Sequence, residues 1–211
     1  MIAVWCVVAL AGELEGMRPA AAPWSVQESY DTHRVAQDLP KQTLACQVLW
    51  PELARLCVRE WTDGRRSWLS VDAAEAGGVD LPSVHTSFVD ASANRISKDL
   101  ERVEVQGFSQ VHYRLRDGDG WAVAGVLAPQ AVARKLDAPM VFAAMPSTGV
   151  FVAWVPGDPE FDQVMAVGVR EIYDAASDRV SPVVMRWESG QWNAYAEAKP
   201  VQSVQPSPSG D

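Results

Sequence analysis

Short runs of hydrophobic residues alternate with turn residues through most of the chain between residues 44 and 197. Runs of this length, rich in Val and aromatic residues and bounded by Gly, Pro or Asp, are typical of β-strands. The dipeptide Asp63-Gly64 between two such runs is a strong hairpin signal. The pattern predicts strands at residues 43–50, 56–61, 67–71, 103–105, 111–115, 121–127, 140–145, 150–155, 183–188 and 191–195.

Three other stretches carry apolar residues at helical spacing. Asp80 can cap a helix that extends toward Ile96, with Pro82 in its first turn, and a short helix is predicted at residues 129–136. Asp158 caps the third helix, whose apolar face consists of Phe161, Val164, Met165, Val169, Ile172 and Tyr173. Strands joined by tight turns, with two or three covering helices, predict an α+β fold with a mostly antiparallel sheet.

The same pattern divides the chain into three parts. Residues 44–197 are predicted to form a single α+β domain, because the regular hydrophobic runs are confined to them. Residues 1–43 are interpreted as an N-terminal extension, in which residues 12–43 form a linker or mobile arm with one short helix. Residues 198–211, with Pro, Ser and Gln, are predicted to be a disordered tail.

The first eleven residues allow two interpretations. Residues 2–11 are an apolar run that ends in Ala9-Leu10-Ala11, as in a signal peptide, but no Lys or Arg precedes the run. The run is also too short to span a bilayer as a helix, so no integral membrane segment is expected. We expect a cytoplasmic protein; export is the alternative, if residues 1–11 act as a signal peptide.

Composition and charge narrow the class of partner. The chain has 211 residues, 48% of them hydrophobic, and a net charge of −9, which disfavours binding to nucleic acid or to an anionic membrane surface. The pair Arg65-Arg66 is interpreted as part of a solvated hairpin turn. Nine Trp residues are spread along the chain, and an exposed one is a natural anchor for another protein.

The three cysteines do not have the spacing of a metal site. Cys46 and Cys57 would form a disulfide if they lay on neighbouring strands, but their apolar surroundings favour buried free thiols. An odd number of cysteines also argues against a framework of disulfides.

From about Val48 to Tyr195 the chain resembles the YtpQ-like proteins, the domain-of-unknown-function family 1444. The resemblance lies in the runs at residues 120–127, 139–147 and 150–155, in the helix at 158–176, and in the ending at 181–192. It implies an α+β fold and a bacterial origin. The family has no established activity to transfer.

One turn departs from the family pattern. Relatives usually carry a basic or amide residue followed by Asp after the proline of this turn, whereas this chain has Pro146-Ser147-Thr148-Gly149. Any chemistry that the turn performs in relatives is therefore expected to be missing here, which favours a binding role over catalysis.

No catalytic, cofactor-binding or metal-binding motif is present. His33, His85 and His112 have no second ligand at metal-site spacing, and the segment 117–120 lacks the later acidic ligands of a calcium loop. We therefore expect no cofactor and no metal, and interpret the protein as a non-catalytic binding or accessory module whose partner is another protein. The alternative is a hydrolase whose site assembles distant residues around His85 or His112, with an Asp or a Cys.

Overall fold

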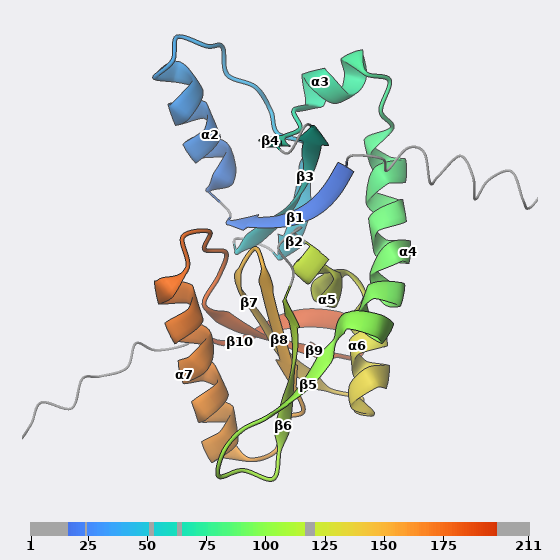
Figure 1. Cartoon of the computed structure of the whole chain (residues 1–211), viewed down its shortest axis with the longest axis vertical. Coiled ribbons are helices and arrows are strands. Elements are labelled where there is room, and N and C mark those ends of the chain that lie inside the picture. The colour runs from blue at the N-terminus through green and yellow to red at the C-terminus, as the bar shows by residue number, and fades with distance from the viewer. Residues whose placement is uncertain (1–16, 24, 51–52, 63–64, 117–120, 198–211) are drawn as a thin grey trace, which may run out of the picture.

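The chain folds into two antiparallel β-sheets with helices packed on them (Figure 1). The computed structural model describes residues 17–23, 25–50, 53–62, 65–116 and 121–197. The signal-like segment 1–11, the tail 198–211 and the turns at Asp63-Gly64 and at residues 117–120 lie outside the described residues. Among the described helices, none has both the length and the apolar composition needed to cross a bilayer.

The four-stranded sheet is built around β3 (Ala54–Thr62). One edge of β3 pairs along its length with β1 (Met17–Pro23). The other edge is shared by β2 (Cys46–Trp50) and β4 (Arg65–Trp68), which pair with its beginning and its end respectively. Two helices accompany this sheet: α2 (Val26–Val35), which follows β1, and α3 (Val71–Ala76), which follows β4.

The six-stranded sheet has the order β10-β9-β7-β8-β6-β5, and every neighbouring pair in it is antiparallel. Its strands are β5 (Glu101–Glu104), β6 (Val111–Arg116), β7 (Val141–Ser147), β8 (Val150–Trp154), β9 (Val183–Glu188) and β10 (Gln191–Glu197). Tight turns connect β7 to β8 and β9 to β10, as the sequence predicts.

Helices cover both faces of the six-stranded sheet. The helix α7 (Pro159–Ala175) packs one face through Phe161, Met165 and Val169. The other face meets a 3₁₀ turn (Trp121–Val123), α5 (Ala124–Leu127) and α6 (Pro129–Leu136). The longest helix, α4 (Leu81–Asp99), runs beside both sheets (Figure 1).

One hydrophobic cluster joins the two sheets. It contains Leu56 and Val58 from the four-stranded sheet, Phe88 and Ile96 from α4, and Phe151 from the six-stranded sheet, all fully buried. Because their apolar side chains share one core, the two sheets stabilise each other by burial.

The α+β class and the mostly antiparallel pairing are confirmed. All three predicted helices are present, and Asp158 caps α7 by accepting hydrogen bonds from the backbone N–H groups of Glu160 and Phe161. The helices number more than the two or three expected, because α2, α3 and α5 add to them. The strand predicted at 67–71 ends at Trp68, and Val71 already begins α3.

Two expectations are wrong. Residues 121–127 form helical turns rather than a strand. Their side chains are almost all buried. A short apolar run that is buried on every side shows neither the helical nor the strand period of hydrophobic residues, so the sequence pattern does not distinguish the two. Residues 17–35 are not a linker, because they form β1 and α2, although α2 agrees with the one short helix predicted in this region. In β1, Ala20, Ala21 and Ala22 are fully buried, so the strand shows no alternation of apolar and polar residues.

Candidate functional site

Two adjoining hollows lie between the four-stranded sheet, α2 and the segment that follows α7. The first has a volume of about 640 Å³ and the second about 520 Å³, and both are lined by Arg59 and Trp68. We call their joint surface the α2 groove. The first hollow is lined in addition by Val26, Ser29, Tyr30, His33 and Ser67, and the second by Ala22, Pro23, Thr148, Ala176, Ser177, Asp178 and Arg179.

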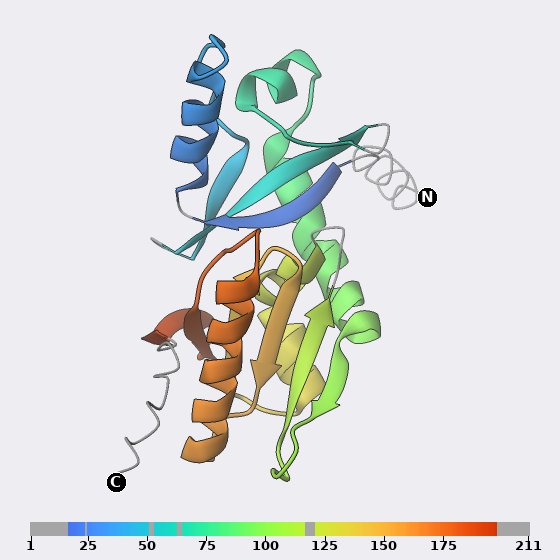
Figure 2. The same ribbon diagram turned by 60° about the vertical axis from the view of Figure 1, so that its left-hand side comes forward.

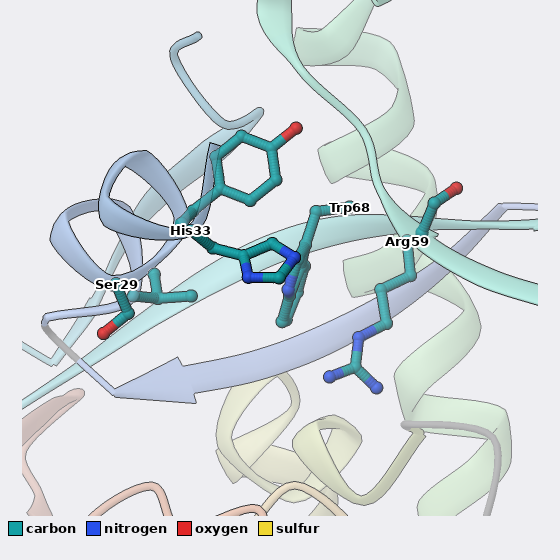
Figure 3. Close-up of a pocket in the computed structure, with 7 residues that line it drawn as sticks. Ser29, His33, Arg59 and Trp68 are labelled. Carbon is teal, nitrogen blue, oxygen red and sulfur yellow. The ribbon is translucent and has the colours of Figure 1, made fainter. Parts of the chain in front are cut away.

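Arg59 and Trp68 stand at the junction of the two hollows. They are directly opposite each other in the β3–β4 hairpin, so their side chains project from the same face of the sheet. The Arg59 guanidinium carbon lies 4.1 Å from the centre of the Trp68 ring, a cation–π contact. Figure 3 shows Trp68 between the imidazole of His33 and the guanidinium of Arg59. This pair therefore gives the groove an aromatic surface with a fixed positive charge beside it.

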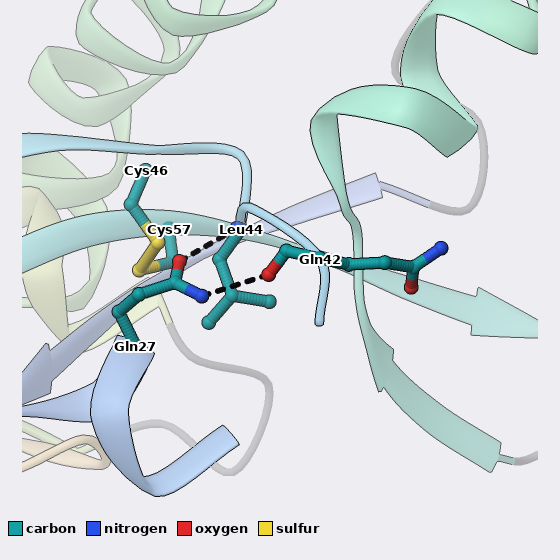
Figure 4. The surroundings of a disulfide bond; sticks show 5 residues. All are labelled: Gln27, Gln42, Leu44, Cys46 and Cys57. Carbon is teal, nitrogen blue, oxygen red and sulfur yellow. Dashed lines mark hydrogen bonds between the residues drawn. A yellow bond between two sulfur atoms is a disulfide. The ribbon is translucent and has the colours of Figure 1, made fainter. Parts of the chain in front are cut away.

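The helix α2 forms one wall of the groove. Val26, Ser29, Tyr30 and His33 are three or four residues apart, so they share one face of the helix. Gln27 ties the helix to the segment before β2: its side-chain amide donates to the Gln42 carbonyl at 2.7 Å, and its oxygen accepts from the Leu44 N–H at 2.8 Å (Figure 4). These two bonds fix the helix that carries the wall.

The opposite wall comes from the turn between β7 and β8 and from the segment after α7. The Thr148 N–H donates to the Asp178 carbonyl at 3.1 Å, and the Thr148 hydroxyl donates to the Asp178 carboxylate. Arg179 donates to the carbonyls of Ala176 at 3.1 Å and Asp174 at 2.5 Å. Thr148 thus brings the turn between β7 and β8 into the groove with a hydroxyl group.

A disulfide lies beneath the groove. Cys46 and Cys57 are bonded to each other, which confirms the disulfide alternative and shows that the expectation of free thiols is wrong for this pair (Figure 4). The two residues face each other across β2 and β3 with their Cα atoms 4.0 Å apart. Cys57 is buried with Ala22, Val26 and Leu44, and Tyr30 and Trp68 pack against this cluster. The covalent link therefore supports residues that line the groove.

The charge of the groove is opposite to that of the whole protein. Among the described residues of its lining, Arg59 and Arg179 are basic, and the acidic Asp178 accepts a hydrogen bond from the Thr148 hydroxyl. Near the end of α7, a hydrogen bond from Arg170 lowers the pKa of Asp174, and the charges of Arg170 and Arg179 lower it further. The surface of a protein with a net charge of −9 thus contains a local basic site.

The structure does not bring the predicted histidines together. His85 lies on α4, His112 on β6 and His33 on α2. Burial lowers the pKa of His85; burial, and secondarily the charge of Arg114, lowers the pKa of His112. In the described parts of the chain, no hydrogen bond or ion pair joins His85 or His112 to an acid, and Cys46 and Cys57 are held in the disulfide.

Within residues 17–197, excluding the gaps named above, no group of three or more His, Cys, Asp or Glu could hold a metal ion. Comparisons with protein-family models, with curated proteins and with solved structures find no match to this chain. The resemblance to the YtpQ-like proteins therefore stays a prediction.

Sequence reasoning missed Arg59, Trp68 and Tyr30 as site residues because no motif contains them. One signal was present. The Asp63-Gly64 dipeptide predicts a two-residue turn, which would pair Thr62 with Arg65 and hence Arg59 with Trp68, and this is the register observed. The sequence predicts one short helix in residues 12–43, but residues 17–35 show no lasting apolar period that would indicate which face of α2 lines a groove.

Proposed function

We propose that the protein is a non-catalytic binding module that holds a segment of another protein in the α2 groove. The observation that carries this proposal is the pair Arg59 and Trp68 at the junction of two hollows, with Tyr30 beside them. Trp, Tyr and Arg are the residue types that contribute most often to binding energy in protein interfaces. Two adjoining hollows suit a stretch of chain better than one compact molecule.

Trp68 differs from four other tryptophans of the described chain in its burial or its contacts. Trp121, Trp154 and Trp187 are buried in the core, and the ring nitrogen of Trp192 donates to the Val126 carbonyl at 3.2 Å. Trp68 is only partly buried and lines both hollows. Its ring thus offers surface to a partner, as an exposed tryptophan anchor requires.

The hydrolase alternative gains no comparable observation. It needs a histidine beside an acid or a thiol, and among the described residues His85 and His112 have neither. The α2 groove contains His33, but the hydrogen-bond partner of His33 is the Gln37 side chain at 3.1 Å.

The disulfide supports the exported alternative over a cytoplasmic location, because disulfides persist in oxidising compartments. Mass spectrometry of the protein from its native host checks this proposal. A mature chain that lacks the first residues, with Cys46 and Cys57 protected from alkylation, is the expected result. An intact Met1 together with alkylated Cys46 and Cys57 would contradict export.

The binding function is tested by selection of a library of random 12-residue peptides, displayed on phage, against the full-length protein. Enriched peptides should bind the native protein and lose about thirtyfold in affinity on Trp68→Ala, the cost of a typical hot-spot residue of about 2 kcal/mol. Tyr195→Ala is the matched control, because Tyr195 is an aromatic residue with 54% exposure on β10, outside the groove. Absence of enriched peptides, or equal losses in the two variants, would overturn the proposal.

A further inference from the structure

We infer that the α2 groove selects an acidic segment, in which a carboxylate binds between Arg59 and Arg179 and a neighbouring apolar side chain packs against Trp68 and Tyr30. This inference rests on the proposed binding function and names the chemistry of its partner. Arg59, at the junction of the two hollows, and Arg179, in the wall after α7, line the same hollow. A carboxylate placed there would be near two positive side chains.

The two arginines are held in place before any partner arrives. Arg59 packs over Trp68, and Arg179 is fixed by the carbonyls of Ala176 and Asp174. The Arg179 side chain also packs over the Tyr173 ring, with its guanidinium carbon 5.4 Å from the ring centre. A side chain that is already ordered loses less conformational entropy on binding, so these contacts favour affinity for a carboxylate.

One acid, Asp178, lines the second hollow together with Arg179. Its carboxylate accepts the Thr148 hydroxyl and is directed to that turn. An acidic ligand therefore does not have to displace an ion pair between Asp178 and Arg179, since Arg179 hydrogen-bonds to backbone carbonyls.

The first hollow specifies the rest of the ligand. Val26, Tyr30 and the Trp68 ring give it an apolar and aromatic lining. A segment that spans both hollows would place an apolar side chain in the first and an acidic one in the second. The pattern expected in a partner is thus an Asp or Glu within a few residues of a Leu, Phe or Trp.

The charge of the whole protein decides between two kinds of anion. Nucleic acid would also supply negative groups for Arg59 and Arg179, but its long run of phosphates would meet the surface of a protein with a net charge of −9. A short acidic peptide needs the two arginines alone. The balance of local and global charge therefore favours the peptide.

The test uses the most enriched peptide of the display selection and a twin in which each Asp and Glu is replaced by Asn and Gln. Fluorescence anisotropy should show the acidic peptide binding at least about tenfold tighter than its twin, as expected for a charge-assisted hydrogen-bonded pair. Arg179→Gln should remove most of this preference. Arg134→Gln, on the exposed side of α6, should leave it unchanged.

The outcomes separate the two proposals. If peptides bind but the twin binds equally well, the acidic preference is wrong and the binding function stands. If no peptide is enriched, the binding function itself fails. Tighter binding of a 20-nucleotide single-stranded RNA than of the acidic peptide, lost in Arg179→Gln, would overturn the inference in favour of nucleic acid. Circular dichroism of each variant confirms its fold. Arg59→Lys gives a second, charge-preserving change at the junction of the two hollows.

Discussion

The two sheets of this protein are stabilised in different ways. The six-stranded sheet contains large side chains that are almost completely buried, among them Met145, Phe151 and Trp154. The four-stranded sheet buries smaller side chains: Ala20, Ala21, Ala22 and Ala54 are fully buried beside Leu56 and Val58, and a disulfide joins two of its strands. Large aromatic side chains contribute far more hydrophobic free energy than alanines do, so the smaller sheet depends more on its covalent link and on close packing.

The groove lies on the four-stranded sheet, which is the sheet with the smaller buried side chains. α2 and α7 lie on the same side of the molecule, one above the other, and the groove lies between α2 and the segment that follows α7 (Figures 1 and 2). Binding surfaces are commonly found in regions of lower local stability, because partners require some adjustment there. The disulfide and Gln27 limit that adjustment on the sheet side.

The largest effect should come from the core of the six-stranded sheet. Phe151 is fully buried, and the backbone of Gly125 lies so close to its ring that an added Cβ would be 2.4 Å away. Phe151→Ala should therefore lower the free energy of unfolding by about 3–5 kcal/mol in urea titrations. Val155→Ala, with 39% of the side chain exposed next to the same strand, is the control and should change it by less than about 0.5 kcal/mol. A loss below about 1 kcal/mol for Phe151→Ala would contradict the comparison.

The disulfide should matter next, and mainly for the smaller sheet. It closes a loop with a sequence separation of 11 residues, so Cys46→Ala together with Cys57→Ala should cost about 3 kcal/mol. Amide hydrogen exchange should become faster in β1, β2 and β3 than in β7, β8 and β9. Cys6→Ala leaves the disulfide intact and is the control. Equal acceleration in both sheets would show that their stabilities are not separable.

A helix cap should have a smaller effect, and the chain offers a matched pair. Asp158 accepts hydrogen bonds from two backbone N–H groups of α7, whereas the carboxylate of Asp80 accepts the hydroxyl of Ser83 at the start of α4. Asp158→Ala should lower the free energy of unfolding by about 1 kcal/mol, and Asp80→Ala by clearly less. Thermal unfolding of both variants measures the difference; a larger loss for Asp80→Ala would refute this account of the caps.

The smallest effect should be a pH dependence that originates in the six-stranded sheet. Burial, and then the charge of Arg114, lowers the pKa of His112 below its ordinary value of 6.5. As the pH falls below 6.5, the unfolded chain therefore takes up the proton before the folded protein does, and stability decreases. His112→Gln should flatten the plot of unfolding free energy against pH just below 6.5. His33→Gln, on the exposed side of α2, is the control, and an equal flattening in both variants would exclude His112 as the cause.

The sequence predicted most of the six-stranded sheet because its strands are separated by unambiguous turns. Ser189-Gly190, for example, adopts the positive backbone φ angles of a tight hairpin turn, and Pro159 begins α7 after its cap. The prediction failed where burial is complete on every side. Residues 121–127 are helical and β1 is a strand, but neither shows the alternation on which the reasoning depends.

The candidate site was predictable only in part. The pairing of Arg59 with Trp68 follows from the length of one turn, but their approach to Arg179 depends on how the two sheets pack together. Arg179 is far away in the sequence, and no local pattern specifies that packing. The disulfide was likewise predicted only as an alternative to free thiols. Whether Cys46 lies opposite Cys57 depends on the register in which β2 pairs with β3, which the sequence pattern does not specify.

The pairing of β1 with β3 also bears on the order of folding during synthesis. Met17 pairs with Glu60 and Pro23 with Ala54, so β1 leaves the ribosome well before its partner strand exists. The β3–β4 hairpin closes a short loop and can form quickly. β1 can pair only after β3 has been synthesised, and this pairing closes a loop several times longer. While β1 is unpaired, its alanine-rich sequence exposes little apolar surface that could associate with other chains.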